Sequence, residues 1–339
     1  MSAAQPPPAT TETPLARPVD RMPADDAPIG SATVTPDLAR GLSSAVNRAV
    51  SRAGITTAAP VALPAPTNIS PSDFLRRRHN MIERVGERWR PPLFSPPATA
   101  LARVSASIRR FLDLQAGSIW RDLKAELARP HGSVLDVGCG AQPYRGLVNP
   151  ADRYIGIDIA AAKDYFGYEI PDTLYYSGDT WPVADASTDL VLCTETLEHV
   201  REPGAFLDEA ARVTKAGGSI LITVPFAARW HFIPHDYWRY TPSSLRDLLE
   251  KHGFGEVAVF ARGNHVTVAC YKWMALILPL LMPSGVNPVT GMLMRLIGLV
   301  FSPLLLLLAG IANVSLLGRG GDDCLGYTAV ATRSAADKE

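Results

Sequence analysis

The sequence has few cysteines, no excess of charge of either sign and no recognisable secretory signal. Its 339 residues include only four cysteines, none in a C-x-x-C pair, which argues against a disulfide framework or a zinc site, and we expect no bound metal. Lys plus Arg and Asp plus Glu both total 33, so no net charge would attract nucleic acid, and we expect no nucleic-acid partner. The N-terminus lacks a basic stretch followed by an apolar core, so we expect no secretory signal and a cytoplasmic location.

Aromatic residues are nearly absent from residues 1–70, which are rich in Pro, Ala, Thr and Ser. Such a segment cannot bury enough apolar area to offset the entropy of ordering, so we predict a disordered tail. An amphipathic pattern then predicts one helix from Ser72 and a second helical stretch after Pro97. We expect this N-terminal extension, 71–130, to cover the edge of the following domain, 131–339, or alternatively to shape an acceptor pocket.

From Ser133 onward, apolar strands alternate with helical stretches, which is typical of a parallel sheet with helices on both faces. This α/β pattern predicts seven strands, the last of them after a long apolar insertion. The predicted strands are Val134–Val137, Tyr154–Ile159, Leu174–Ser177, Leu190–Thr194, Ser219–Pro225, Val257–Ala261 and Gly326–Thr332.

The strongest motif is VLDVGCG at residues 134–140, an apolar strand that ends in an acid and a glycine pair. Glycines at the end of a first strand let a ligand approach the backbone, and the helix expected to follow offers its N-terminus. The turn is therefore of a nucleotide-binding type. A dinucleotide-binding G-x-G-x-x-G would require glycine at position 143, which is Pro143, so a hydride-transferring dehydrogenase loses most of its support.

Three further motifs follow VLDVGCG in the order found in the class I S-adenosylmethionine-dependent methyltransferases, and the sequence resembles that family. These motifs are YIGIDI at 154–159, DLVLCTETLEHV at 189–200 and VTKAGGSILITVP at 213–225. The resemblance covers about residues 103–262 and the last strand. It implies a Rossmann-like seven-stranded sheet with an antiparallel last strand, S-adenosylmethionine as cofactor, and methyltransferase activity.

The resemblance implies cofactor contacts at the ends of the first two strands. Asp136, Gly138 and Gly140 are expected around the methionine and ribose parts of the cofactor, with Asp136 paired to its amino group. Asp158 ends the second strand twenty positions after Gly138, the spacing at which an acid accepts hydrogen bonds from both ribose hydroxyls.

The ends of the third and fourth strands complete the expected cofactor site. After the third strand, the resemblance implies adenine contacts, and we favour Asp179 for the exocyclic amine. At the end of the fourth strand, Thr194 and Glu195 should border the sulfonium. Glu198 and His199 are expected to start the next helix, where an acid also suits the helix dipole.

A polar and aromatic loop, residues 230–241, follows the fifth strand and is costly to bury without a purpose. It resembles the PHDYWRFT segment of a bacterial methyltransferase subgroup often found among cell-envelope and polysaccharide genes, with Tyr240 in place of Phe. We assign His231, His235 and Asp236 to the catalytic group, with either histidine as the base that deprotonates a hydroxyl acceptor. Alternatively, Asp236 and Arg239 pair to fix the loop.

The apolar insertion, 271–318, contains one charged residue between Trp273 and Gly318, namely Arg295. Because the final strand, 326–332, returns to the sheet, the insertion can cross a membrane twice or not at all. Four prolines interrupt it and its first half is short, so we favour a helical hairpin lying in the membrane interface over two crossings. A soluble lid or oligomer contact is the remaining alternative.

These features predict a methyltransferase acting on a hydroxyl or other nucleophile of a small-molecule, sugar or lipid-linked acceptor at the membrane face. The protein would be cytoplasmic and bound peripherally to the inner face of the cell membrane. The main alternative is a noncatalytic S-adenosylmethionine-binding scaffold of a membrane-associated complex.

Overall fold

The structure is a computed structural model that describes residue 97 and residues 99–334. The tail predicted over 1–70 and the helix predicted from Ser72 lie outside the described residues. The described elements, in chain order, are α3 (Ala100–Leu112), α4 (Leu114–Leu127), β1 (Ser133–Val137), η2 (Arg145–Leu147), β2 (Arg153–Ile159), α5 (Ala162–Phe166), β3 (Thr173–Tyr176), β4 (Thr188–Thr194), η3 (Leu197–His199), α6 (Pro203–Val213), β5 (Thr214–Pro225), α7 (Pro242–Lys251), β6 (Phe254–Arg262), α8 (His265–Leu281), α9 (Pro288–Ser315) and β7 (Gly326–Arg333).

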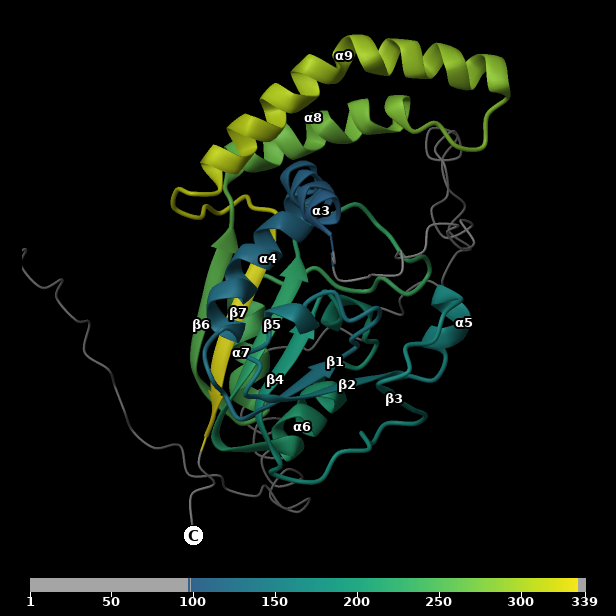
Figure 1. Cartoon of the computed structure of the whole chain (residues 1–339). Coiled ribbons are helices and arrows are strands. Elements are labelled where there is room, and N and C mark those ends of the chain that lie inside the picture. The colour runs from purple at the N-terminus through teal and green to yellow at the C-terminus, as the bar shows by residue number, and fades with distance from the viewer. Residues whose placement is uncertain (1–96, 98, 335–339) are drawn as a thin grey trace, which may run out of the picture. The chain divides into compact units, whose positions relative to one another are not determined.

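The seven strands form one sheet in the order β3-β2-β1-β4-β5-β7-β6 (Figure 1). The pairs β1–β2, β1–β4, β2–β3 and β4–β5 are parallel, whereas β7 runs antiparallel to both β5 and β6. The predicted Rossmann-like sheet with an antiparallel last strand is confirmed. The carboxyl ends of the parallel strands meet at one edge, where open α/β sheets bind ligands.

Side-chain alternation along the strands builds a hydrophobic core on each face of the sheet. Leu135 and Val191 pack with α6 and α7 on one face. Val134 and Leu190 pack with Ile119, Leu123 and Leu127 of α4 on the other face. The helices on both faces that the sequence predicts are therefore present.

The helical stretch expected after Pro97 is broken at Asp113. This residue closes α3 and caps α4, and its side chain accepts a hydrogen bond from the backbone N–H of Ala116. Of these two helices, α4 packs on the sheet and α3 does not. The apolar side of α3 is not buried, and its residues Leu101, Val104 and Ile108 are exposed, so the expectation that both helical segments cover the domain edge is wrong for α3.

The apolar insertion forms two helices, α8 and α9, that pack against each other beyond the carboxyl edge of the sheet (Figure 1). The first part of α8 joins a third core, in which Val268, Cys270 and Met274 pack with Leu114 and Leu325. Because β6 precedes α8 and β7 follows α9, the hairpin leaves and rejoins the sheet between two hydrogen-bonded strands. Helix α9 is long and apolar enough to cross a membrane by length and composition.

Candidate active site

A cavity of about 570 Å³ lies at the carboxyl ends of β1, β2, β3 and β4, within the range of small-molecule sites. Among its lining residues are five that the sequence assigns to the site: Gly138, Asp158, Asp179, Glu195 and His231. The cavity therefore joins predicted cofactor residues to one predicted catalytic residue. Asp136, Gly140, Thr194, His235 and Asp236 are not among the residues that line it.

The glycine turn after β1 needs both of its glycines in left-handed backbone conformations, with φ of 69° at Gly138 and 49° at Gly140. Their surroundings differ. A Cβ on Gly138 would lie 2.3 Å from Cγ2 of Thr196, whereas a Cβ on Gly140 would meet nothing within 4 Å. The turn thus packs directly against the segment that follows β4.

This difference predicts unequal effects for two otherwise similar substitutions. Gly140→Ala should lower stability by about 1–2 kcal/mol, the cost of a left-handed alanine. Gly138→Ala should cost more because Thr196 must also move. We expect melting temperatures to fall by about 2–8 °C for Gly140→Ala and further for Gly138→Ala, with partial recovery in Gly138→Ala/Thr196→Ser. Equal losses for the two single variants in differential scanning fluorimetry would contradict the proposed contact.

Asp136 is buried at the end of β1. Its Oδ2 accepts a hydrogen bond from the Tyr154 hydroxyl at 2.8 Å, and its Oδ1 has no hydrogen-bond partner within the described part of the chain. Burial raises the pKa of this carboxyl to about 7. The unpartnered oxygen is an acceptor of the kind that the predicted amino-group contact requires.

Asp158 is anchored by backbone groups on both sides. Its Oδ2 accepts from the N–H of Gly140 at 2.9 Å, and its Oδ1 accepts from the N–H of Ile159 at 2.8 Å. Burial raises the pKa of Asp158, and these two hydrogen bonds oppose the rise. Each carboxylate oxygen has a second lone pair, so the fixed carboxylate can accept two more donors from the cavity.

Beyond β3 and β4, the predicted residues take different positions. Asp179 is exposed at the cavity wall. Thr194 lies outside the lining, and its carbonyl accepts from the Thr196 hydroxyl at 3.1 Å. Glu195 lines the cavity with φ of 47°, a strained conformation that persists where surrounding contacts hold it. Its Oε1 accepts from the buried Arg262 guanidinium at 2.8 Å, which fixes the carboxylate.

Asp236 makes the pairing with Arg239 that the sequence offered as an alternative. Its carboxylate forms a two-point ion pair with Arg239, at 2.6 and 2.8 Å, and accepts from the backbone N–H of His231 at 3.0 Å. Burial would raise the pKa of Asp236, but Arg239 and His231 hold it well below its usual range. Because the carboxylate is fully engaged and outside the cavity lining, we no longer assign Asp236 to proton transfer.

The two loop histidines are not equivalent. His231 lines the cavity, whereas the ring of His235 packs on Tyr165 with centroids 5.1 Å apart. The backbone carbonyl of His235 accepts from Nδ1 of His199 at 2.8 Å. Further bonds from the backbone N–H groups of Tyr237 and Trp238 to the carbonyl of Glu198 dock the loop onto the turn after β4.

Glu198 and His199 form a 3₁₀ turn, not the start of the next helix, because α6 begins only at Pro203. Glu198 is completely buried, and neither carboxylate oxygen has a hydrogen-bond partner among residues 99–334. Burial raises the pKa of Glu198 well above its usual range, and the negative charge of Glu195 adds to the rise. Burial lowers the pKa of His199 to about 4.

Several lining residues have no motif that would identify them from the sequence. Tyr165 and Phe166 lie on α5, a helix of five residues that is too short to show periodicity. Thr196 follows the fourth strand immediately, so the rule that ligands bind beyond carboxyl ends could have included it. The remaining lining residues not predicted as site residues are Val137, Ile159, Ala162, Tyr176, Gly178, Trp181, His199, Val200, Arg201, Glu202, Ala205, Phe206 and Phe232.

The sheet order and the polar groups at its carboxyl edge are typical of α/β domains that bind a ligand beyond the carboxyl ends of their strands. Residues 109–259 match the family model described as "Methyltransferase domain". Together, these findings show that this segment is similar to the S-adenosylmethionine-dependent methyltransferase domains.

Named relatives are similar over parts of the chain. An uncharacterized protein of transposon TN4556 from Streptomyces fradiae is 33% identical over 32% of this chain and 34% of its own length. An uncharacterized methyltransferase of Mycobacteroides abscessus is 32% identical over 31% of this chain and 44% of its own. A ubiquinone biosynthesis O-methyltransferase of Cereibacter sphaeroides is 30% identical over 40% of this chain and 66% of its own length. The chain thus spans less than half of the length of the first two relatives.

Solved structures are more distant. The match to an S-adenosylmethionine-dependent methyltransferase from Archaeoglobus fulgidus covers 67% of this chain and 99% of that protein. The two sequences are 17% identical, and the TM-score is 0.41.

Proposed function

We propose that this protein is an S-adenosylmethionine-dependent methyltransferase acting on a hydroxyl or other nucleophile of a small-molecule, sugar or lipid-linked acceptor at the cytoplasmic face of a membrane. The observation that carries the proposal is that one cavity is lined by both the anchored carboxylate of Asp158 and the imidazole of His231. The loop sequence around His231 also supports membership of the bacterial subgroup with a PHDYWR(F/Y)T segment.

The residues present fit the cofactor. The left-handed glycine turn leaves room for close approach, Asp158 holds two free acceptor positions, and Asp136 keeps one unpartnered oxygen. When bound, S-adenosylmethionine supplies a methyl group on positively charged sulfur, already activated toward a nucleophile. The chain must then orient the acceptor and remove its proton.

His231 is the cavity residue best placed to take that proton. Its Nδ1 lies 3.0 Å from both the Arg229 carbonyl and the Asp236 carboxylate, so this nitrogen carries the ring proton. The Nε2 atom is then left with its lone pair, as a general base requires. His235 lies outside the lining, so we propose no proton transfer for it.

These positions predict a difference between two histidine variants. His231→Ala should lower the turnover number by about 10²- to 10⁴-fold, the usual contribution of a positioned acid or base, with cofactor affinity nearly unchanged. His235→Ala should have a smaller effect because its ring packs outside the cavity. Steady-state kinetics and calorimetry on both variants test this. Parallel losses of cofactor binding would instead assign the loop a role in folding.

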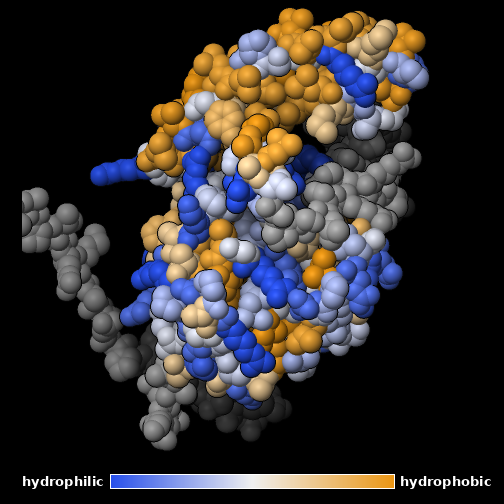
Figure 2. All heavy atoms as spheres, viewed as in Figure 1, coloured by the Kyte–Doolittle hydropathy of each residue, from blue (hydrophilic) through white to orange (hydrophobic). Residues whose placement is uncertain are grey.

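The apolar hairpin supports action at a membrane surface. Exposed leucine, valine and methionine side chains cover α8 and α9, and Figure 2 shows their hydrophobic surface at one end of the domain. The hairpin leaves the sheet at the same edge as the cavity, because β6 runs parallel to β4 and β5. An acceptor held at the membrane surface would therefore be near the cavity entrance.

Cofactor titration and a labelled transfer assay test the proposal. The purified full-length protein should bind S-adenosylmethionine but not a nicotinamide dinucleotide in calorimetry. With a labelled methyl group and a cell extract separated into lipid, water-soluble and macromolecular fractions, label should enter the lipid or water-soluble fraction. Binding without transfer to any fraction would favour the alternative, a noncatalytic scaffold of a membrane-associated complex.

A further inference from the structure

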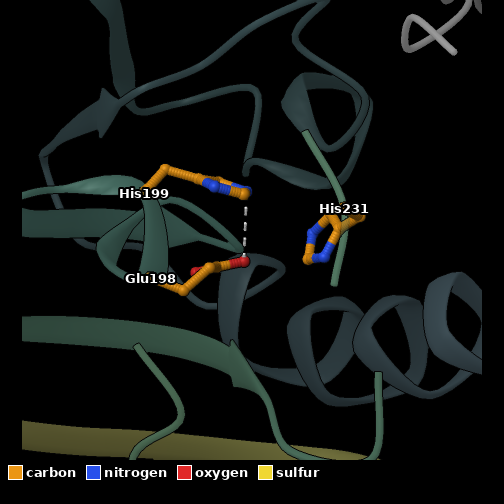
Figure 3. A group of neighbouring side chains, drawn as sticks. All are labelled: Glu198, His199 and His231. Carbon is orange, nitrogen blue, oxygen red and sulfur yellow. Dashed lines mark ion pairs between the residues drawn. The ribbon is translucent and has the colours of Figure 1, made fainter. Parts of the chain in front are cut away.

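Three side chains of types that can bind a metal ion lie together beside the cavity: Glu198 and His199 from the turn after β4, and His231 from the loop after β5 (Figure 3). One ligand atom from each residue lies within 4.8 Å of the other two. Bonds from a metal ion to histidine nitrogen or carboxylate oxygen are about 2.0–2.2 Å, which places neighbouring ligand atoms roughly 3–3.5 Å apart. Side-chain shifts of about an ångström would bring the three ligand atoms within bonding distance of one ion.

Glu198 is completely buried, and both of its carboxylate oxygens are without hydrogen-bond partners in the described part of the chain. His199 Nε2 lies 3.6 Å from Oε1 of Glu198, which is too long for a hydrogen bond. A buried carboxyl group without a partner is costly, and a cation between these atoms would remove that cost.

Both histidines are oriented as metal ligands usually are. Nδ1 of His199 donates to the carbonyl of His235, and Nδ1 of His231 faces the Arg229 carbonyl and the Asp236 carboxylate. Each ring therefore directs its unprotonated Nε2 away from these partners. Hydrogen bonds of this kind, from the second ring nitrogen to a carbonyl or carboxylate, fix the tautomer of metal-binding histidines.

We propose that Glu198, His199 and His231 bind one divalent first-row transition-metal ion, in contrast to the sequence expectation of no metal. Two imidazoles and one carboxylate suit Zn²⁺, Mn²⁺ or Fe²⁺ better than Mg²⁺, which prefers oxygen ligands. His199 and His231 line the cavity, so the remaining coordination positions face the space where the acceptor binds.

This inference rests on the proposed function for its chemical meaning. A cation at this position would attract the oxygen of an acceptor hydroxyl and lower its pKa, so that the proton leaves to solvent water. His231 cannot be a free base while it binds a metal, so the ion would replace it as the activating group. The site would then select acceptors whose hydroxyl, or pair of neighbouring hydroxyls, can reach the ion.

Metal binding can be measured without cofactor or acceptor. Untagged full-length protein is dialysed against EDTA and titrated with Mn²⁺, monitored by the electron paramagnetic resonance signal of free Mn²⁺, and with Zn²⁺ by calorimetry. We expect one site per chain. Glu198→Gln and His231→Gln should each weaken binding by more than about 100-fold, because even substitutions behind the ligands cost 10- to 100-fold.

Matched controls are Glu202→Gln, which lines the same cavity outside the group, and His235→Gln, which keeps the backbone carbonyl that orients His199. Both controls should bind metal as the wild type does, and thermal melting verifies that all variants fold. Absence of stoichiometric binding to the wild type, or equal binding to the Glu198→Gln and His231→Gln variants, overturns the metal site. If the protein binds metal but EDTA leaves methyl transfer unchanged, the activating role of the ion is overturned. If the protein does not bind S-adenosylmethionine, only the proposed function is overturned.

Discussion

Asp158→Ala is expected to weaken S-adenosylmethionine binding by roughly 10²- to 10⁴-fold. Hydrogen bonds to a charged group contribute about 1.5–3 kcal/mol each, and the carboxylate has two free acceptor positions for the ribose hydroxyls. Because Gly140 and Ile159 hold both oxygens in place, the carboxylate needs little reorganisation on binding. Isothermal titration calorimetry measures the loss directly.

A control is required because Asp158 also supports the glycine turn. Asp247→Ala removes an exposed acid of similar size on α7, where Asp247 pairs only with the exposed Lys251, and should leave affinity unchanged. Thermal melting without ligand separates lost affinity from lost folding. If Asp158→Ala folds as the wild type does and binds the cofactor with the same affinity, Asp158 does not contact the ribose.

The sheet could be predicted from the sequence because its signal is local. Apolar residues that alternate between two cores, such as Val134 and Leu135 on β1, specify both the strand and its two buried faces. The predicted β1 and β2 therefore begin within one residue of the observed strands. The glycine turn and Asp158 follow from the same register, because they end those strands.

Residues of the candidate site could be predicted where they end a strand, as Asp158 does, or where they belong to a recognisable loop motif, as His231 does. The turn at Leu197–His199 is a single 3₁₀ turn with no periodic pattern, so the acid and histidine there were assigned to a helix. Pro203, at the first turn of α6, was the available signal for the true helix start. The convergence of Glu198 with His231 depends on how the loop after β5 folds back, and no local pattern encodes it.

The amphipathic pattern of α3 shows a different limit of local sequence signals. Its apolar side predicts a contact surface, but a pattern on one helix does not specify the surface that covers it. In the structure α3 contacts α9, and Leu101, Val104 and Ile108 stay exposed beside the hairpin.

The hairpin geometry favours a position in the membrane interface over a crossing. A single crossing by α9 is excluded because β6 and β7, which flank the hairpin, are hydrogen-bonded neighbours in one sheet. Two crossings would require α8 to enter lipid, yet Thr267, Val268 and Met274 are buried in the domain. A helix pair that lies along the surface keeps these contacts and still exposes α9 to lipid.

Replacing exposed leucines of α9 with glutamine is therefore expected to release the protein from membranes. Leu299, Leu306 and Leu307 are 64%, 55% and 59% exposed. Full burial of a leucine contributes about 1.5–3 kcal/mol, so about half of that for each residue shifts the partition of the triple variant by roughly 40- to 2000-fold. Sedimentation with vesicles of mixed neutral and anionic lipids measures this shift.

The control for this prediction compares two single substitutions of similarly exposed leucines. Leu307→Gln lies on the hairpin, whereas Leu174→Gln changes a residue of β3, at the opposite edge of the sheet, that is 48% exposed. Both substitutions lower the hydrophobicity of the protein equally, so a difference between them must come from position. Only Leu307→Gln should reduce vesicle binding.

If the wild type stays in the supernatant with vesicles present, α9 covers another protein surface or the cavity entrance, and the acceptor need not be at a membrane. If the triple variant melts early and loses cofactor affinity, these leucines support the domain itself, because a purely lipid-facing surface could be made polar without unfolding the sheet.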